Sequence, residues 1–175
     1  SSFQLDGCFK FKADIGVLMN ITPDHLDRYD YCFQNYVDSK MRITQNQTEG
    51  DFFIFSGDDS VIGGELSKYG LKARQLPFTA AESAATEGGR FDGKQCRVVL
   101  GEKHLTLDAE RMQIKGLHNC YNAMAAALAT LAAGVPAEVV EQSIYAFSPV
   151  EHRLEPVKEA DGVLWINDSK ATNVD

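Results

Sequence analysis

Four short polar segments of this sequence combine residue types that can bind a metal ion, a phosphate or a purine. The first segment, residues 20–29, contains His25 with Asp24 before it and Asp27 shortly after it. A neutral imidazole in a loop could coordinate a divalent ion or donate to a phosphate oxygen. Alternatively, the two carboxylates stabilise a helix start and His25 is simply an exposed side chain.

The second segment, residues 116–123, contains two asparagines three positions apart, Asn119 and Asn122. In a helix this spacing places both side chains on one face of the first turn. Each amide offers a donor and an acceptor, so the pair could bind the edge of a purine. Capping of the helix by Asn119 or His118 is the simpler explanation.

Two further segments lie toward the end of the sequence, at residues 151–155 and 165–173. Arg153 could form an ordinary ion pair, or its planar guanidinium could clamp a terminal phosphate. Asp168 follows an apolar run and could accept hydrogen bonds from ribose hydroxyls. Lys170 could contact a phosphate or a substrate carboxylate.

Apolar runs and amphipathic patterns alternate along the chain and indicate the elements that must position these residues. They predict strands over 13–19, 51–55, 71–78 and 163–166, and helices over 29–43, 59–68, 119–133 and 136–146. A short helix should follow the first strand, with Thr22 as N-cap and Pro23 as its first residue.

Residues 90–114 have a different pattern, which predicts an antiparallel β insert. A hairpin is expected from strands 96–100 and 104–107, with a further short strand at 112–114, as a small flap on a larger body. The predicted fold class is α/β, with a mostly parallel sheet flanked by helices. Ligands bind at the carboxyl ends of such strands, so the chemistry should follow Met19 and Ile166.

The composition narrows the class of function. The chain has 175 residues, 44% of them hydrophobic, and a formal net charge of −8, which suits a globular protein and argues against a nucleic-acid partner. The longest apolar stretch, 123–133, is too short for a membrane span, and residue 1 does not begin a signal peptide. We therefore expect a cytoplasmic protein whose four cysteines are free thiols.

The segment around His25 resembles the motif that carries the metal-binding histidine of the Mur ligase family. Several members carry a carbamylated lysine fifteen residues after that histidine, and Lys40 occupies this position here. Carbamylation replaces the ammonium charge with two anionic oxygens that can bind Mg²⁺. Without the resemblance, Lys40 reads as a surface lysine whose aliphatic stem covers apolar neighbours.

The other three segments resemble the same family in the same order. The resemblance implies that Asn119 and Asn122 face the adenine of ATP and that Arg153 and Asp168 also contact ATP. Residues 168–173 (D-S-K-A-T-N) and the opening S-S-F-Q-L are most similar to the members that add D-glutamate. They imply that Ser1, His25 and Lys170 contact substrate, with Ser1 near the muramoyl part.

The same resemblance implies that Thr172 lies near the incoming D-glutamate. The reaction it implies joins D-glutamate to UDP-N-acetylmuramoyl-L-alanine through an acyl phosphate, with ATP and Mg²⁺. Residues 1–154 would form the ATP-binding central domain, and 155–175 would begin the C-terminal domain.

The sequence departs from the family's pattern: it contains no glycine-rich phosphate-binding loop and no glutamate before Ser1. That loop supplies much of the grip on the phosphates of ATP. The family's N-terminal UDP-binding domain and its C-terminal domain are also missing from this segment. We therefore expect a fragment that lacks ligase activity by itself and has an open slot where the loop's strand would pair.

Two alternatives remain on the sequence alone. A folylpolyglutamate-synthase-like ligase shares the architecture, although residues 168–173 argue against it, and a panel of substrates would separate the two. A non-catalytic nucleotide-binding module is the second alternative, which a G-x-x-G-K-[ST] segment upstream in the gene would exclude.

Overall fold

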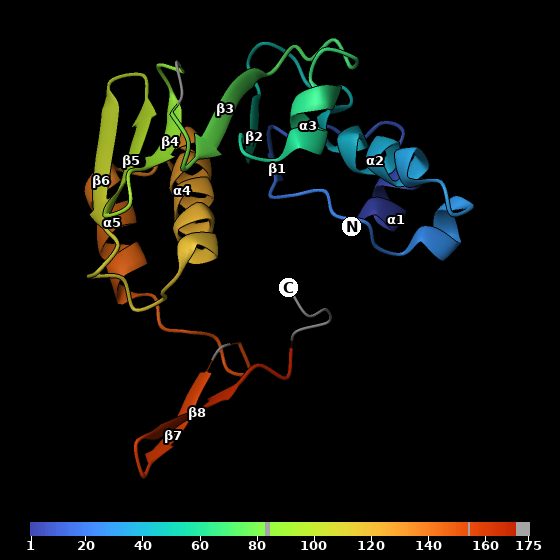
Figure 1. The fold of residues 1–175 in the computed structure, drawn as a ribbon. Coiled ribbons are helices and arrows are strands. Elements are labelled where there is room, and N and C mark those ends of the chain that lie inside the picture. The colour runs from blue at the N-terminus through green and yellow to red at the C-terminus, as the bar shows by residue number, and fades with distance from the viewer. Residues whose placement is uncertain (83–84, 154, 171–175) are drawn as a thin grey trace.

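A computed structural model describes residues 1–82, 85–153 and 155–170. Its main feature is a six-stranded sheet in which spatial order follows chain order (Figure 1). The strands are β1 (Ile15–Leu18), β2 (Phe52–Ser56), β3 (Arg74–Thr79), β4 (Gly88–Phe91), β5 (Gln95–Leu100) and β6 (Lys103–Asp108). The pairs from β1 to β4 are parallel, and β5 and β6 continue the sheet in antiparallel pairing.

Helices cover both faces of this sheet, which confirms the predicted fold class. They are α1 (Ser2–Asp6), α2 (Phe33–Met41), α3 (Ser60–Glu65), α4 (Leu117–Ala132) and α5 (Ala137–Ala146), with two 3-10 turns, η1 (Leu26–Tyr29) and η2 (Arg42–Thr44). Side chains of β2 alternate between two cores: Phe53 and Phe55 pack with α2 and α3, and Ile54 packs with α4. Burial on both faces explains why this strand reads as a continuous apolar run.

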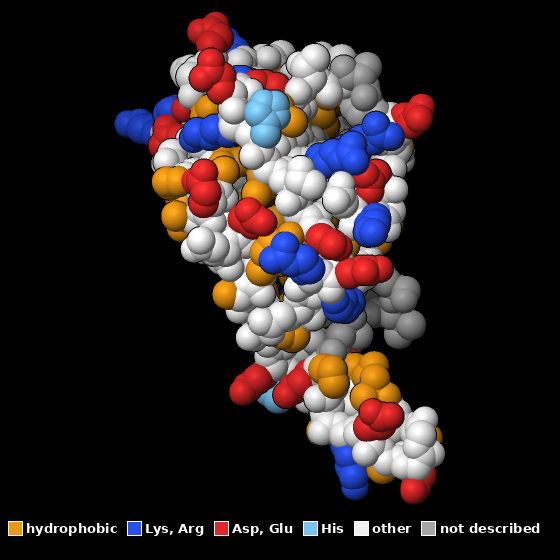
Figure 2. Space-filling model, turned by 90° about the vertical axis from the view of Figure 1, so that its left-hand side faces the viewer, with side chains coloured by type: hydrophobic (Ala, Val, Ile, Leu, Met, Phe, Trp, Pro, Cys, Tyr) orange, Lys and Arg blue, Asp and Glu red, His pale blue; other side chains and the backbone are white. Residues whose placement is uncertain are grey.

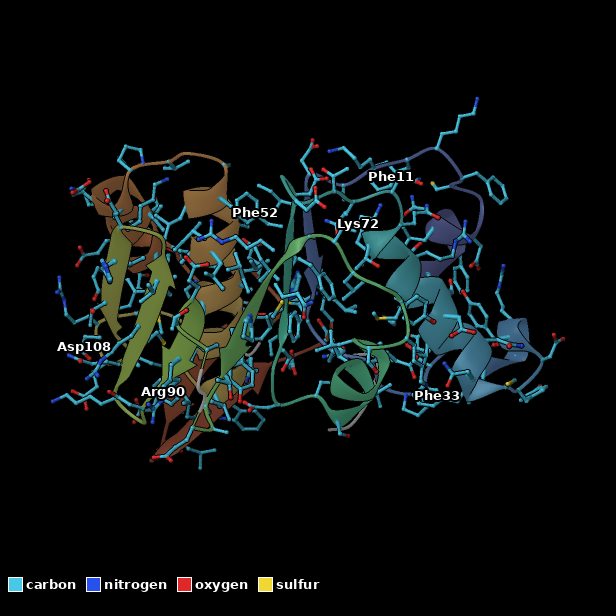
Figure 3. The ribbon with its side chains drawn as sticks, turned by 90° about the horizontal axis from the view of Figure 1, so that it is seen from above. Phe11, Phe33, Phe52, Lys72, Arg90 and Asp108 are labelled. Atoms are coloured by element: carbon cyan, nitrogen blue, oxygen red, sulfur yellow. The ribbon has the colours of Figure 1, made fainter. Side chains whose placement is uncertain are left out.

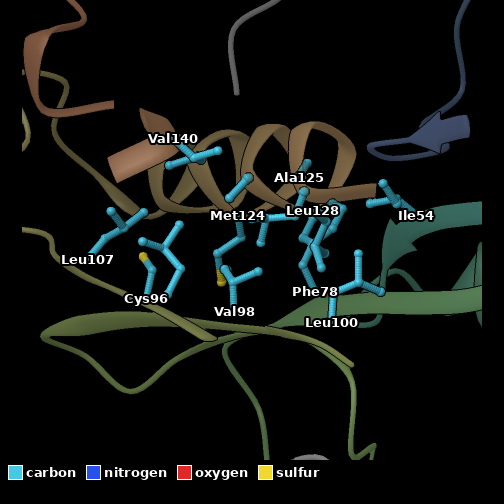
Figure 4. Packing of buried hydrophobic residues seen from close by; sticks show 14 of the residues in the cluster. Ile54, Phe78, Cys96, Val98, Leu100, Leu107, Met124, Ala125, Leu128 and Val140 are labelled. Carbon is cyan, nitrogen blue, oxygen red and sulfur yellow. The ribbon is translucent and has the colours of Figure 1, made fainter. Parts of the chain in front are cut away.

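Helix α4 lies close to the sheet because several residues at the contact are small: Gly89 on β4, and Ala123 and Ala127 on α4. Ala123 and Ala127 are buried, and Met124 and Leu128 point between the helix and the strands beside Val98 (Figure 4). A Cβ added at Gly89 would lie 2.9 Å from the Cβ of Met124. The glycine of β4 and the alanines of α4 therefore set the spacing between the two layers.

The antiparallel hairpin predicted within 90–114 is present, but it extends the main sheet and does not stand apart as a flap. Gly89 of β4 pairs with both Phe78 of β3 and Val98 of β5, so this short strand joins the two regions. The prediction of a strand at 112–114 is wrong. This stretch is a turn, in which Lys115 Nζ donates to the carbonyl of Glu110.

Two helix starts differ from the prediction. Thr22 is not an N-cap, because the turn η1 begins only after His25, whose left-handed backbone (φ 52°) redirects the chain. The helix predicted over 29–43 begins at Phe33, since Asp30 and Tyr31 also adopt left-handed conformations and end η1. The remaining predicted helices and strands in the main body are found, with shifted ends.

The last predicted strand is present but does not belong to the main sheet. Strands β7 (Glu155–Ala160) and β8 (Val163–Asn167) form a separate antiparallel pair that extends away from the body (Figure 1). Asp161 and Gly162 connect them with positive φ angles of 53° and 76°, the conformation that Asp-Gly hairpin turns favour. Much of the hairpin's apolar surface is exposed, including Trp165 at 61% (Figure 2).

Two further sequence expectations can be compared with the structure. Cys8, Cys32, Cys96 and Cys120 are all free thiols, as predicted. Among the described helices, none is long and apolar enough to cross a membrane.

A buried ion pair near the start of β1 leads to a prediction about acid stability. Asp51 is buried, and its pKa is lowered to about 2 by hydrogen bonds from Lys12 Nζ and from the backbone N–H of Thr48. A lowered pKa stabilises the fold fully above the ordinary value of 3.8, and that contribution disappears as the pH falls toward 2. We expect Asp51→Asn to be less stable than wild type at pH 5, with the difference shrinking below pH 4.

Urea unfolding of both proteins at a series of pH values measures this difference. A constant gap in stability between about pH 5 and pH 2 would show that the Asp51 charge does not contribute.

Candidate functional site

His25 lies in the loop that follows β1, at the carboxyl end of the parallel strands. Its side chain is 55% exposed, and its Nε2 lies 3.5 Å from a carboxylate oxygen of Asp24. The imidazole ring also contacts Phe3 of α1, with ring centroids 5.2 Å apart. An exposed imidazole beside a carboxylate is a donor set that suits a divalent cation.

Lys40 lies on α2, where its ammonium group is partly buried. Its Nζ lies 4.9 Å from the centroid of the Tyr36 ring, a cation–π contact. Tyr36 packs edge-on against Tyr29, and Tyr29 stacks on Phe3. A chain of three aromatic rings, Phe3, Tyr29 and Tyr36, thus connects His25 to Lys40.

A partly buried polar network fixes α1 against α2. Ser39 Oγ donates to Asp6 Oδ1 at 2.6 Å, and the hydroxyl of Tyr29 donates to Asp6 Oδ2 at 3.0 Å. Ser1 forms a capping box with Gln4 at the start of α1 and is exposed. The network therefore holds Ser1 and the aromatic chain in one unit with α2.

Asn119 and Asn122 lie on the first turn of α4 and are partnered through their amides. Asn122 Nδ2 donates to Asn119 Oδ1 at 3.3 Å, and Asn119 Nδ2 donates to the carbonyl of Lys115 at 2.8 Å. Capping by Asn119 or His118 is wrong, because the N-cap is Gly116 with a φ of 94°. Glycine takes this position because a side chain there would be strained.

An apolar hollow of about 310 Å³ opens beside Asn122, between α4 and α5. Ala126 and Thr130 line it from α4, and Val140 and Ile144 line it from α5. Asn122 contributes an amide to this lining, which is otherwise mostly apolar, with Thr130 and Ser143 as its other polar residues. A flat, mostly apolar group with a polar edge would fit this arrangement.

The third and fourth polar segments meet at the base of the β7–β8 hairpin. The backbone N–H of Lys170 donates to the carbonyl of His152 at 3.1 Å, and Asn167 Nδ2 lies 2.8 Å from His152 Nδ1. Arg153 and Asp168 each lie next in sequence to one of these bonded residues, so both belong to the base of the hairpin. Thr172 lies outside the described residues.

The donor set for a metal ion is incomplete in the part of the chain that the structure describes. It contains no group of three or more His, Cys, Asp or Glu side chains that could hold an ion. His25 and Asp24 fit a divalent cation, whereas the free amine of Lys40 is itself a cation and would repel one. A carbamate on Lys40 would replace this positive charge with a negative one.

A comparison with known protein families identifies the family of this chain. The family described as the Mur ligase middle domain matches residues 1–130. The chain belongs to this family. The Mur ligase middle domain therefore accounts for α1, the main sheet and nearly all of α4.

Curated relatives extend the similarity over nearly the whole chain. The UDP-N-acetylmuramoylalanine–D-glutamate ligase of Bacteroides fragilis is 49% identical over 175 residues, covering 99% of this chain and 39% of that protein. The enzyme of the same name from Porphyromonas gingivalis is 42% identical, again over 99% of this chain and 39% of its own length. This Mur ligase chain thus spans about 39% of the curated relatives it matches.

Solved structures share the fold at low sequence identity. A MurF from Acinetobacter baumannii has a TM-score of 0.66 at 17% identity, over 90% of this chain and 34% of that one. Escherichia coli FolC, in complex with DHPP and ADP, has a TM-score of 0.60 at 17% identity, with the same coverage. These similarities show that the Mur ligase fold extends to residues beyond 130.

Within this middle domain, the structure brings together some predicted residues and separates others. His25 and Lys40 share the aromatic chain, and Arg153 and Asp168 share the hairpin base. The expectation that the first and last strands end at one sheet edge is wrong, because β8 pairs only with β7. Viewed from above, the half containing Phe33 and the half containing Asp108 lie at opposite ends of the molecule (Figure 3).

Sequence reasoning missed two bonded residues: Asp58, just after β2, and Tyr121, near the start of α4. The Tyr121 hydroxyl donates to Asp58 Oδ2 at 2.5 Å and links the end of β2 to the first turn of α4. The signal was present as two adjacent acidic residues directly after a buried strand, in Ser56-Gly57-Asp58-Asp59. The pattern predicts a helix from residue 59 and assigns no role to Asp58.

Proposed function

We propose that this chain is the ATP-binding part of a ligase that joins D-glutamate to UDP-N-acetylmuramoyl-L-alanine in peptidoglycan precursor synthesis. The observation that carries the proposal is 49% identity, over 99% of the chain, to a relative named for that activity. Both substrates and ATP are nucleotides or amino acids of the cytoplasm, so we place the reaction there.

The proposed domain division follows the fold. Residues 1–154 contain the sheet and its helices, and 155–175 would begin a C-terminal domain with the β7–β8 hairpin. Exposed hairpin residues such as Trp165 and Val157 give that domain an apolar surface to pack on. The UDP-binding domain would contact the opposite part of the chain, near Ser1.

The nucleotide would bind at the first turn of α4. Asn119 and Asn122 present amide groups beside an apolar hollow, which suits an adenine with its polar edge toward the amides. Arg153 would contact the phosphates, and Asp168 would accept from the ribose hydroxyls. Their common position at the hairpin base supports this pairing of roles.

The acid substrate would bind near His25 and Lys40. In the reaction, the L-alanine carboxylate attacks the γ-phosphate of ATP, which releases ADP and forms an acyl phosphate. The amine of D-glutamate then attacks the acyl carbon, displaces inorganic phosphate and loses a proton as the amide forms. Two anions must approach each other in the first step, so positive charge is needed between them. Mg²⁺ held by His25 and a Lys40 carbamate would supply that charge.

The remaining residues would orient the two substrates. Ser1 would lie near the muramoyl group, at the N-cap of α1. Lys170 and Thr172 would contact the carboxylates of D-glutamate. Holding the amine close to the acyl phosphate supplies much of the remaining acceleration.

A substrate panel with the complete ligase tests the proposal. We expect ATP-dependent formation of one amide product, detected by mass spectrometry, with D-glutamate and UDP-N-acetylmuramoyl-L-alanine. Residues 1–175 alone should show no turnover, because they contain no glycine-rich phosphate-binding loop. Glutamylation of a folate, or turnover only with another amino acid, would refute the proposal.

A further inference from the structure

Asp58 and Asp59 are adjacent carboxylates at the carboxyl end of β2, and each bonds to a different part of the proposed site. None of the roles assigned so far uses either residue. The two carboxylates follow a strand in the middle of the parallel part of the sheet, between β1 and β3. This is the edge where α/β proteins bind their ligands.

Asp59 connects the loop after β1 to the start of α3. Its Oδ2 accepts from the backbone N–H of Ile21 at 2.7 Å. Its Oδ1 accepts from the N–H groups of Val61 and Ile62, at 2.9 and 3.0 Å, and so caps α3. Ile21 is buried and begins the segment that leads to His25.

Asp58 connects the end of β3 to the first turn of α4. It accepts from the hydroxyl of Thr79, from the backbone N–H of Ala80 at 2.8 Å and from the hydroxyl of Tyr121. The ring of Tyr121 also packs against Phe78, with centroids 5.6 Å apart. Tyr121 directly precedes Asn122.

The charge states favour this bond at neutral pH. Burial acts to raise the pKa of Asp58, but the hydrogen bonds from Thr79 and Tyr121 outweigh it and leave the pKa below its usual value. Burial and the neighbouring Asp58 raise the pKa of Tyr121 to about 12. The tyrosine therefore remains a donor and the aspartate a charged acceptor, which is the stronger kind of hydrogen bond.

The bond to Asp58 ties the N-terminal part of α4 to the end of β2, whereas the bond from Asn119 Nδ2 reaches only the neighbouring carbonyl of Lys115. The N-cap is Gly116, which has no side chain that could cap the helix. A shift of this turn would move Asn119 and Asn122 together. Misplacement of a binding group by about 1 Å can cost about 100-fold in rate, so a single well-placed bond is sufficient to matter.

We propose that Asp58 and Asp59 are positioning residues for the two halves of the site. Asp58, through Tyr121, holds the turn that carries Asn119 and Asn122 in place for the nucleotide base, and Asp59 holds the loop that carries His25. This inference rests on the proposed function for the identity of the ligands.

Tyr121→Phe in the complete ligase tests the Asp58 half, because it removes one hydroxyl and keeps the ring against Phe78. We expect the KM for ATP and the Kd for ADP to rise about tenfold, with the KM for D-glutamate unchanged. Asp58→Asn should act in the same direction, and the double variant should be no worse than the poorer single variant, since both changes act on the bond between Asp58 and Tyr121.

Tyr145→Phe is the matched control for the lost hydroxyl. Tyr145 OH accepts from the backbone N–H of Asp108 at 2.8 Å. Tyr145 lies on α5 but is not among the residues that line the hollow proposed for the adenine. We expect this variant to lower the melting temperature and leave nucleotide affinity unchanged. If Tyr121→Phe also lowers only the melting temperature, the positioning role of Asp58 is refuted.

Asp59→Asn tests the other half with a different readout. We expect the Mg²⁺ concentration for half-maximal activity to rise, with the Kd for Mg²⁺-free ADP unchanged. An unaltered Mg²⁺ requirement would refute the role of Asp59. Calorimetric titration with ADP measures nucleotide binding without any amino acid substrate. If the ligase rejects D-glutamate, the proposed function is overturned, but the Kd for ADP still tests the role of Asp58.

Discussion

Lys40→Ala in the complete ligase should lower kcat/KM by about 10²–10³-fold, the usual cost of removing one preorganised electrostatic group from an active site. The loss follows if Lys40 acts as a carbamate that holds a cation between ATP and the carboxylate. A short carboxylic acid such as acetate should restore part of the activity of the variant, because it returns an anionic oxygen to the vacated space. Steady-state rates with and without acetate measure both effects.

Two further variants separate the carbamate from a simple positive charge. Lys40→Arg keeps the charge but cannot form the carbamate, so it should be as inactive as Lys40→Ala. Lys72→Ala removes an exposed lysine before β3 and should leave kcat/KM unchanged. An active Lys40→Arg variant would mean that the ammonium group on the Tyr36 face is the functional form.

Gly88→Ala should destabilise the fold by about 3–5 kcal/mol or prevent folding, among the largest effects expected of a single methyl group. An added Cβ would lie 2.1 Å from the carbonyl oxygen of Pro77, and the backbone φ of 123° is unfavourable for any residue with a side chain. Neither strain can relax easily, because β4 is held between β3 and β5. Urea unfolding of the purified variant measures the change.

Gly63→Ala is the matched control, since it also adds a single methyl group. Gly63 lies within α3, and an added Cβ would have no atom within 4 Å. Because alanine favours helices over glycine, the control should be stabilised by about 0.5–1 kcal/mol. Equal stability changes at the two positions would show that the clash with Pro77 is relieved at no cost.

Strand β2 could be predicted because it buries side chains on both faces. Phe53, Ile54 and Phe55 enter alternate cores, so the apolar run was visible without any knowledge of its partners. Strand β4 was missed because two of its residues are glycines, which carry no hydropathy signal. Its role depends on close approach to Met124, which appears only in three dimensions.

The candidate site was predicted at the level of motifs and less well at the level of contacts. The motif of His25 and that of Asn119 gave residue types, but the left-handed backbone at His25 and the glycine cap of α4 are conformations that sequence spacing does not specify. Asp58 was overlooked because its partners, Thr79 and Tyr121, are distant in sequence. The separate β7–β8 pair was signalled by Asp161-Gly162, a hairpin dipeptide that was not used.

The unbroken order of β1 to β6 bears on how the chain is made by the ribosome. Among the described strands, each one that emerges finds its neighbour already synthesised, and none must later be inserted between two earlier ones. Assembly during translation can therefore proceed from one end of the sheet to the other, at the pace of elongation, about 5–20 residues per second. The layer formed by α4 arrives after β6, when the surface that receives it is complete.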